Sequence, residues 1–317
     1  MAGVAASVLL LGRPSLQVGM VCCAGLALGA MGLVDDDVTL PPRVRLLAEL
    51  AAAVAAASLG ITVHVTGNAA PDFVITLVWI VGITNALNLL DNMDGLAAGV
   101  AAVVATAVLV LAVAGEQHAV ILLAAALAGA CAGFLVHNRR PASIFMGDAG
   151  SLFLGFILAL ITIEVSPALR TPDSFAVPVM LLAVAVLDTT TVTLGRIRHG
   201  RSVLQGGKDH LSHRLVKRGL SMGLAVWLLI AVEAVAATLA VLAGRELLSL
   251  RVAAAAVLAG LALLVAATWR ANVYDTPATP LRTRLALALR GGRTGADGVG
   301  VDPVLPPTIL VDVDSRR

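Results

Sequence analysis

Long, unbroken runs of apolar residues constrain the fold of this 317-residue chain more than any other feature. A helix needs roughly 20 apolar residues to cross a bilayer, and helices satisfy every backbone polar group at membrane depth. Runs near that length recur at 17–34, 46–63, 72–90, 96–114, 119–136, 150–166, 175–194, 221–243 and 249–269. We therefore predict an all-α fold, a polytopic transmembrane helix bundle of about nine to ten spans.

The composition excludes several other classes of protein. Hydrophobic residues make up 59% of the chain and charged residues 13%, with a mean hydropathy of +0.94. Soluble globular proteins carry about 25% charged residues. An ordinary cytosolic enzyme, a disordered chain and a nucleic-acid-binding module are thereby excluded, and no nucleic-acid partner is expected. An outer-membrane barrel would show short alternating segments instead of long continuous runs.

Basic residues gather on alternate linkers between the predicted spans. The basic set comprises 35–45, 91–95, 137–149, 195–220 and the tail from 270. On the remaining linkers the basic residues are only Arg13, Arg170, Arg245 and Arg251. Positive charge marks the cytoplasmic side of a membrane protein. We therefore expect a multi-pass membrane protein in which this set of linkers faces the cytoplasm.

Two regions are predicted from these patterns. Residues 1–270 form an integral membrane domain. Residues 271–317, rich in Gly, Pro and charge, form a flexible cytoplasmic tail with a short helix at 281–290. The apolar piece 1–12 is too short to span a bilayer, so we interpret it as the end of a helix whose start is absent.

Carboxylates near the ends of the spans need explanation, because charge is costly at membrane depth. Asp35, Asp36 and Asp37 directly follow an apolar run. A solvated helix end explains them in the simplest way. However, acidic groups at a helix C-terminus oppose the helix dipole, and adjacent carboxylates repel one another unless a cation or proton lies among them. The triplet therefore also suits a cation-dependent site.

Polar residues recur at every third position at the end of another apolar run. These are Asn85, Asn88, Asp91 and Asp94. On a continuous helix such a stripe slants, so the first and last members point apart. A helix that ends or bends near 92–95 would let both Asp residues face one pocket. A hydrogen-bond ladder inside the bundle explains the two Asn residues but leaves two carboxylates without partners.

A Gly-rich turn opens the run at 150–166. Gly147, Asp148, Gly150 and Ser151 follow Phe145 and Met146. Free N–H groups at such a helix N-terminus suit an anion such as a phosphate. Alternatively, Asp148 is an N-cap.

The long basic linker contains a cluster of chemically active side chains. Its members are Lys208, Asp209, His210, His213 and Arg214. Part of its charge is explained by attraction to anionic lipids and by topology. Two His residues at i and i+3 share a helix face, but no Cys or HExxH pattern supports zinc. Phosphate contact is the favoured use of His beside Arg and Lys.

These motifs occur in an order that resembles a known family, the polyprenyl-phosphate N-acetylhexosamine-1-phosphate transferases of glycosyltransferase family 4. In chain order they are Asp35-Asp36, the stripe Asn85 to Leu96, Phe145 to Ser151, Asp188-Thr189 and the Asp209 to Arg214 cluster. The likeness covers about residues 3–270. The resemblance implies that a polyprenyl phosphate attacks the β-phosphorus of a UDP-N-acetylhexosamine, most closely UDP-GlcNAc. UMP leaves and a lipid-diphospho-sugar forms for cell-envelope glycan synthesis.

The resemblance also implies roles, a cofactor and partners. Asp35, Asp36, Asp91 and Asp94 would be catalytic, with the first two near the lipid phosphate. Asp148 and Asp94 would bind Mg²⁺, with Mn²⁺ as an alternative. Phe145 would stack on uracil. The remaining substrate contacts would be Asn85, Asn88, Lys208, His210, His213 and Arg214. Expected partners are the UDP-sugar, polyprenyl phosphate, the lipid bilayer and a second copy in a homodimer.

Three departures from the family pattern leave alternatives open. Asn92 stands where a Gly is usual, and Ser212 stands where many members have a further His. Ser212 favours the GlcNAc branch over phospho-N-acetylmuramoyl-pentapeptide transferase. The family's first helix and first cytoplasmic loop are not found, which keeps a non-catalytic relative open. A transporter would also carry intramembrane carboxylates, but its polar groups would gather near mid-bilayer in a repeated pattern.

Overall fold

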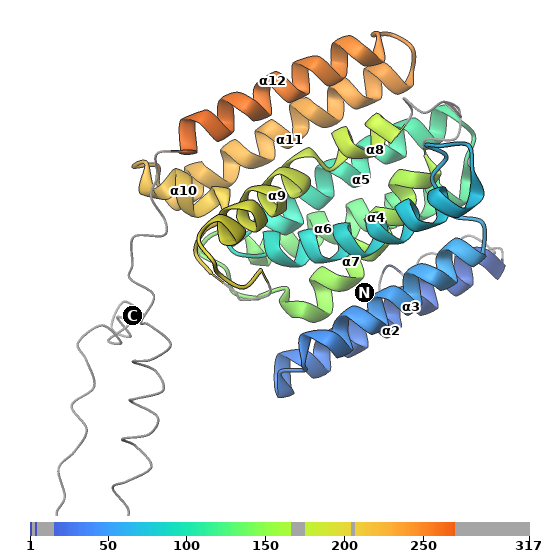
Figure 1. The fold of residues 1–317 in the computed structure, drawn as a ribbon, viewed down its shortest axis with the longest axis horizontal. Coiled ribbons are helices and arrows are strands. Elements are labelled where there is room, and N and C mark those ends of the chain that lie inside the picture. Colours follow the sequence, from blue (N-terminus) through green and yellow to red (C-terminus); the bar gives the residue numbers. More distant parts are fainter. Residues whose placement is uncertain (2–3, 5–15, 166–174, 204–206, 270–317) are drawn as a thin grey trace, which may run out of the picture. The chain divides into compact units, whose positions relative to one another are not determined.

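The computed structural model describes residues 1, 4, 16–165, 175–203 and 207–269, and within them the chain is helical without any strand (Figure 1). The helices are α2 (Leu16–Val38), α3 (Pro42–Ser58), α4 (Ala69–Leu90), α5 (Leu96–Ala114), α6 (His118–Asn138), α7 (Gly147–Glu164), α8 (Ala176–Leu181), α9 (Ala183–Arg198), α10 (Leu211–Lys217), α11 (Met222–Gly244) and α12 (Leu250–Trp269). The predicted all-α fold is confirmed.

Seven described helices are long and apolar enough to cross a membrane: α2, α4, α5, α6, α7, α11 and α12. The prediction of about nine to ten spans is somewhat high. The run at 46–63 forms the 17-residue α3, and the run at 175–194 is broken into α8 and α9. The piece 1–12, apart from Met1 and Val4, and the predicted tail 271–317 with its helix at 281–290 lie outside the described residues. The protein is a multi-pass membrane protein.

Helix α7 is buried along most of its length and packs against α2 and α4 (Figure 1). Glycines permit these close approaches. A Cβ on Gly32 of α2 would lie 2.5 Å from the carbonyl carbon of Asp148, and a Cβ on Gly155 of α7 would lie 2.8 Å from Cα of Thr84. Small residues are common where transmembrane helices meet because they let backbones approach. The N-terminus of α7 is therefore fixed against the C-terminal end of α2.

A buried carboxylate stabilises the break between α8 and α9. The chain leaves helical geometry at Leu182, and the first N–H groups of α9 lack partners in their own helix. Glu233 of α11, fully buried, accepts a 2.8 Å hydrogen bond from N of Val184. The run at 175–194, predicted as one span, is thus divided into two helices, and a tertiary partner replaces the missing intrahelical bonds. Helix α9 then carries Asp188 toward the linkers described below.

Candidate active site

Three of the linkers predicted to share one side of the membrane meet at one end of the bundle. N of Gly95 donates to Oδ1 of Asn138 at 2.9 Å, and N of Ala142 donates to Oδ2 of Asp94 at 3.2 Å. Oγ of Ser212 donates to Oδ1 of Asn92 at 2.6 Å. The linker after α4 is thus bound to both the linker after α6 and helix α10. The candidate residues lie around this junction.

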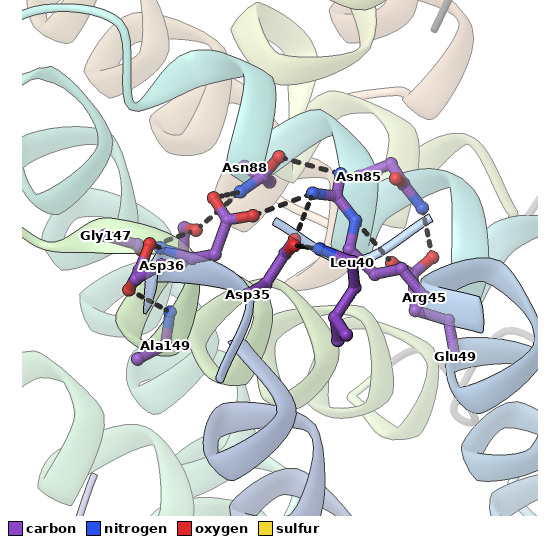
Figure 2. Close-up of polar contacts among 11 residues, drawn as sticks. Asp35, Asp36, Leu40, Arg45, Glu49, Asn85, Asn88, Gly147 and Ala149 are labelled. Carbon is purple, nitrogen blue, oxygen red and sulfur yellow. Dashed lines mark hydrogen bonds and ion pairs between the residues drawn. The ribbon is translucent and has the colours of Figure 1, made fainter. Parts of the chain in front are cut away.

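The N-terminus of α7 is occupied by a carboxylate of the protein itself (Figure 2). Oδ1 of Asp36 accepts from N of Asp148 at 2.9 Å, and Oδ2 accepts from N of Ala149 at 3.4 Å. Gly147 makes room with a φ of +63°. An anion does lie at this helix end, as the sequence indicated, but it is Asp36. The alternative that Asp148 caps the helix is wrong, because the N-cap is Met146 and makes no side-chain cap bond.

Arg45 of α3 contacts four residues, and Asp148 is one of them (Figure 2). Its Nη1 lies 2.7 Å from Oδ2 of Asp148 and 3.3 Å from Oδ2 of Asp35. Its Nη2 donates to Oδ1 of Asn88 at 3.1 Å, and its Nε lies 3.6 Å from Oε1 of Glu49. Nδ2 of Asn88 in turn donates to Oδ1 of Asp148 at 2.7 Å. One guanidinium therefore joins α2, α3, α4 and α7.

Glu49 lies behind this network and is 1% exposed. Nδ2 of Asn85 donates to its Oε2, whereas its Oε1 is buried without a hydrogen-bond partner among the described residues. Neither Glu49 nor Arg45 was predicted as a site residue from the sequence, where Arg45 counted only toward the positive charge of its linker. Their i,i+4 spacing in an otherwise apolar run is the signal that would have found them. Asn85 and Asn88 orient this charged network.

The break that was predicted after the Asn/Asp stripe is confirmed. Helix α4 ends at Leu90 and α5 begins at Leu96. Burial, followed by the negative charges of Asp148, Asp36 and Asp94, raises the pKa of Asp91 to about 6. The neighbouring carboxylates therefore add to the effect of burial on Asp91.

The donor set fits Mg²⁺ in its chemistry, although no preformed cage is present. Among residues 16–165, 175–203 and 207–269, no three His, Cys, Asp or Glu side chains converge on one point. Mg²⁺ usually takes only one or two carboxylates, with waters and substrate phosphates completing its shell. Asp35 and Asp148 both direct a carboxylate oxygen at one point, Nη1 of Arg45. Asp94, the other predicted ligand, binds N of Ala142.

The histidine cluster is fixed from behind by α9. Oδ2 of Asp188 lies 2.7 Å from Nδ1 of His210, and Oδ1 accepts from N of Leu211 at 2.6 Å. Arg196, eight residues after Asp188 on the same helix, binds both carboxylate oxygens of Asp209 instead, each at 2.8 Å. His210 is 3% exposed. Its ring is therefore a support for the start of α10.

Arg214 is also buried, and its Nε donates to the carbonyl oxygen of Asp209 at 3.0 Å. His213 is half-buried. Burial, together with the positive charges of His210 and Lys208, lowers its pKa. Of the two predicted histidines, His213 is the one that reaches an open space.

That space is a cavity of about 490 Å³ beside the acidic residues. Three predicted residues line it, Asp94, Lys208 and His213. The other lining residues are Asn92, Met93, Arg140, Pro141, Lys217, Val216, Met222 and Val226. Arg140 and Lys217 were not singled out from the sequence, because a basic linker gives no sign of which charges face inward. Phe145, 73% exposed, is not among the lining residues.

The two positions that depart from the family pattern contact each other. Asn92 and Ser212 share the 2.6 Å hydrogen bond described above, and Ser212 is buried. Asn92 also lines the cavity. The pair links the acidic linker to the histidine cluster.

The fold and the site together define a multi-pass membrane protein with a carboxylate cluster beside a basic cavity. The profile of "Glycosyl transferase family 4" matches residues 18–166. A decaprenyl-phosphate N-acetylglucosaminephosphotransferase of Mycobacterium tuberculosis is 31% identical over 292 residues, covering 81% of this chain and 72% of the relative. The chain belongs to glycosyltransferase family 4.

Other relatives match over shorter stretches. A probable undecaprenyl-phosphate N-acetylglucosaminyl 1-phosphate transferase of Bacillus subtilis is 33% identical over 207 residues. The match covers 62% of this chain, and the chain spans 57% of the length of that relative. A phospho-N-acetylmuramoyl-pentapeptide-transferase of Heliobacterium modesticaldum is 48% identical over 120 residues, 38% of this chain and 35% of the relative.

Proposed function

We propose that the protein transfers GlcNAc-1-phosphate from UDP-GlcNAc to a polyprenyl phosphate. The relatives with the longest matches described above are named for N-acetylglucosamine phosphate transfer to undecaprenyl or decaprenyl phosphate. An oxygen of the lipid phosphate attacks the β-phosphorus of UDP-GlcNAc. The bond from that phosphorus to the bridging oxygen breaks, UMP leaves with that oxygen, and the lipid-diphospho-sugar remains. The reaction takes place at the cytoplasmic face of a bacterial inner membrane.

One observation carries the proposal: a cluster of carboxylates adjoins a cavity lined by cationic side chains. Asp94, whose negative charge acts on Asp91, lines the cavity together with Lys208, Lys217 and Arg140. Phosphoryl transfer between two anions depends on positioning and on offsetting negative charge. The cationic side would hold the diphosphate, with His213 at its edge. The carboxylate side would bind the cation that screens the approaching lipid phosphate.

Asp148 and Asp35 would hold Mg²⁺, which supplies neutralisation of the phosphate charge when bound. Asp36 fixes the first turn of α7 and so orients Asp148. Asp91, whose pKa is raised to about 6, is the carboxylate whose environment suits proton exchange near neutral pH. His210 and Arg214 would act through the position of α10, with His213 making the direct contact. Asn85 and Asn88 would orient the charged network.

The test is UMP release by the purified full chain in detergent, from UDP-GlcNAc with Mg²⁺, with and without undecaprenyl phosphate. We expect lipid-dependent UMP release that Asp148→Asn reduces by a factor of about 100 or more. The size-exclusion profile of this variant should stay that of the wild type. No release from UDP-GlcNAc would refute the proposal for this sugar.

A parallel reaction with UDP-N-acetylmuramoyl-pentapeptide tests the second candidate, which the 120-residue match to the H. modesticaldum protein favours. That match excludes most of the chain. We expect turnover of UDP-GlcNAc and none of the pentapeptide substrate. The reverse pattern would place the chain among the phospho-N-acetylmuramoyl-pentapeptide transferases. No UMP release from either substrate would favour a transporter or a non-catalytic relative.

A further inference from the structure

Arg45 occupies the place where two carboxylates of the acidic site converge. Its Nη1 lies 2.7 Å from Asp148 and 3.3 Å from Asp35. Arg45 is partly exposed, with 24% of its side chain accessible, so the site is open to exchange. A divalent cation bound to the same two oxygens would lie beside the guanidinium, and like charges at such a separation repel strongly. The divalent cation and the guanidinium of Arg45 therefore cannot bind this pair of carboxylates at the same time.

A second position for the guanidinium is already built. Oε1 of Glu49 is buried, has no hydrogen-bond partner among the described residues, and lies 3.6 Å from Nε of Arg45 (Figure 2). This distance allows an ion pair but exceeds a normal hydrogen bond. A buried carboxylate oxygen without a partner is costly, and a small movement of Arg45 toward Glu49 would satisfy it. Oε2 is meanwhile held by Asn85, so Glu49 keeps its place.

We propose that Arg45 is a resident counter-cation of the acidic site that moves from Asp35 and Asp148 to Glu49 when a divalent cation binds. Glu49 is then a positioning residue that acts through Arg45. Without the metal, Arg45 offsets the repulsion between the carboxylates and holds α2, α3 and α7 together. The inference rests on the proposed function in its need for a divalent cation at these residues.

The experiment measures binding of Mn²⁺ alone to the purified full chain by electron paramagnetic resonance, without substrates. Arg45→Gln removes the competing charge, so Mn²⁺ affinity should rise by about tenfold. A residue with only a structural role would give unchanged or weaker binding, and either result would overturn the proposal. Arg43→Gln is the matched control, because Arg43 is exposed on the same helix two residues away. It should leave affinity within about twofold.

Glu49→Gln keeps the size of the side chain and guards against a misfolded Arg45 variant. It removes the second position of Arg45, so Mn²⁺ affinity should fall by about threefold to tenfold. In the Arg45→Gln background the same change should have little effect, because Glu49 acts through Arg45. Equal effects of Glu49→Gln in both backgrounds, or no effect on the wild type, would contradict the proposal.

The two hypotheses fail separately. Tighter Mn²⁺ binding by Arg45→Gln without UMP release by the wild type would support the exchange and refute the transferase proposal. UMP release by the wild type with weaker Mn²⁺ binding by Arg45→Gln would support the transferase proposal and refute the exchange. If neither the wild type nor Arg45→Gln binds Mn²⁺, the exchange is refuted whatever the activity.

Discussion

Replacing Asp188 tests whether α9 positions the histidine cluster. In Asp188→Ala, Nδ1 of His210 and N of Leu211 both lose a buried acceptor, at 2.7 and 2.6 Å in the wild type. Hydrogen bonds to a charged group contribute about 1.5–3 kcal/mol each. Removing one partner of a buried pair costs about 3–5 kcal/mol. We expect a loss of this size in the free energy of unfolding.

The loss should appear both in stability and in substrate binding. His213 follows His210 by three residues and lines the cavity, so disorder at the start of α10 should raise KM for UDP-GlcNAc by about tenfold. Thermal unfolding in detergent and the KM from UMP release measure the two effects. Asp188→Asn keeps an acceptor for Leu211 without the charge, so its loss should be smaller, about 1–2 kcal/mol.

Thr190→Ala provides the matched control, because Thr190 is exposed on α9 and bonds only the carbonyl of Val186 among the described contacts. It should change the unfolding free energy by less than about 0.5 kcal/mol. Unfolding of Asp188→Ala at the wild-type temperature, together with a wild-type KM, would refute the positioning of the histidine cluster by α9.

Three further predictions concern the ends of the helices. Gly32→Ala places a Cβ 2.5 Å from the backbone of Asp148 and should destabilise the chain by about 1–3 kcal/mol. The control is Gly19→Ala on the same helix, where a Cβ would meet nothing within 4 Å, and it should not lower the thermal unfolding midpoint. Folding raises the pKa of Asp91 to about 6, so the folded chain binds this proton more tightly than the unfolded chain does. The resulting contribution to the free energy of unfolding is full below the unfolded pKa of Asp91 and is lost as pH rises through about 6. The thermal unfolding midpoint of the metal-free protein should fall over that range, and Asp91→Asn should make this fall smaller. A fall of equal size in the variant would mean that another group causes it. A double-mutant cycle of Asn92→Ala and Ser212→Ala should show a coupling of about 0.5–1.5 kcal/mol in thermal unfolding, and strict additivity would contradict the contact.

The sequence predicted elements and the kinds of residue at the site, but not which residues pair. The end of α4 at Leu90 was predictable because its polar stripe cannot stay on one face of a straight helix. The break within 175–194 was not, because the partner that compensates for it, Glu233, is distant in the sequence. Likewise Asp188 has several cationic neighbours along the chain, and only packing brings it to His210 rather than to Arg196.

Apolar length and the order of short polar motifs are local properties of a chain, and they were enough to predict a multi-pass helical membrane protein of glycosyltransferase family 4. Tertiary packing, in contrast, brings Asp36 to the N-terminus of α7 and places Arg45 between Asp35 and Asp148. These contacts connect residues from different helices. They depend on the approach of α2 to α7 at Gly32, and no local pattern specifies which side chains such an approach brings together.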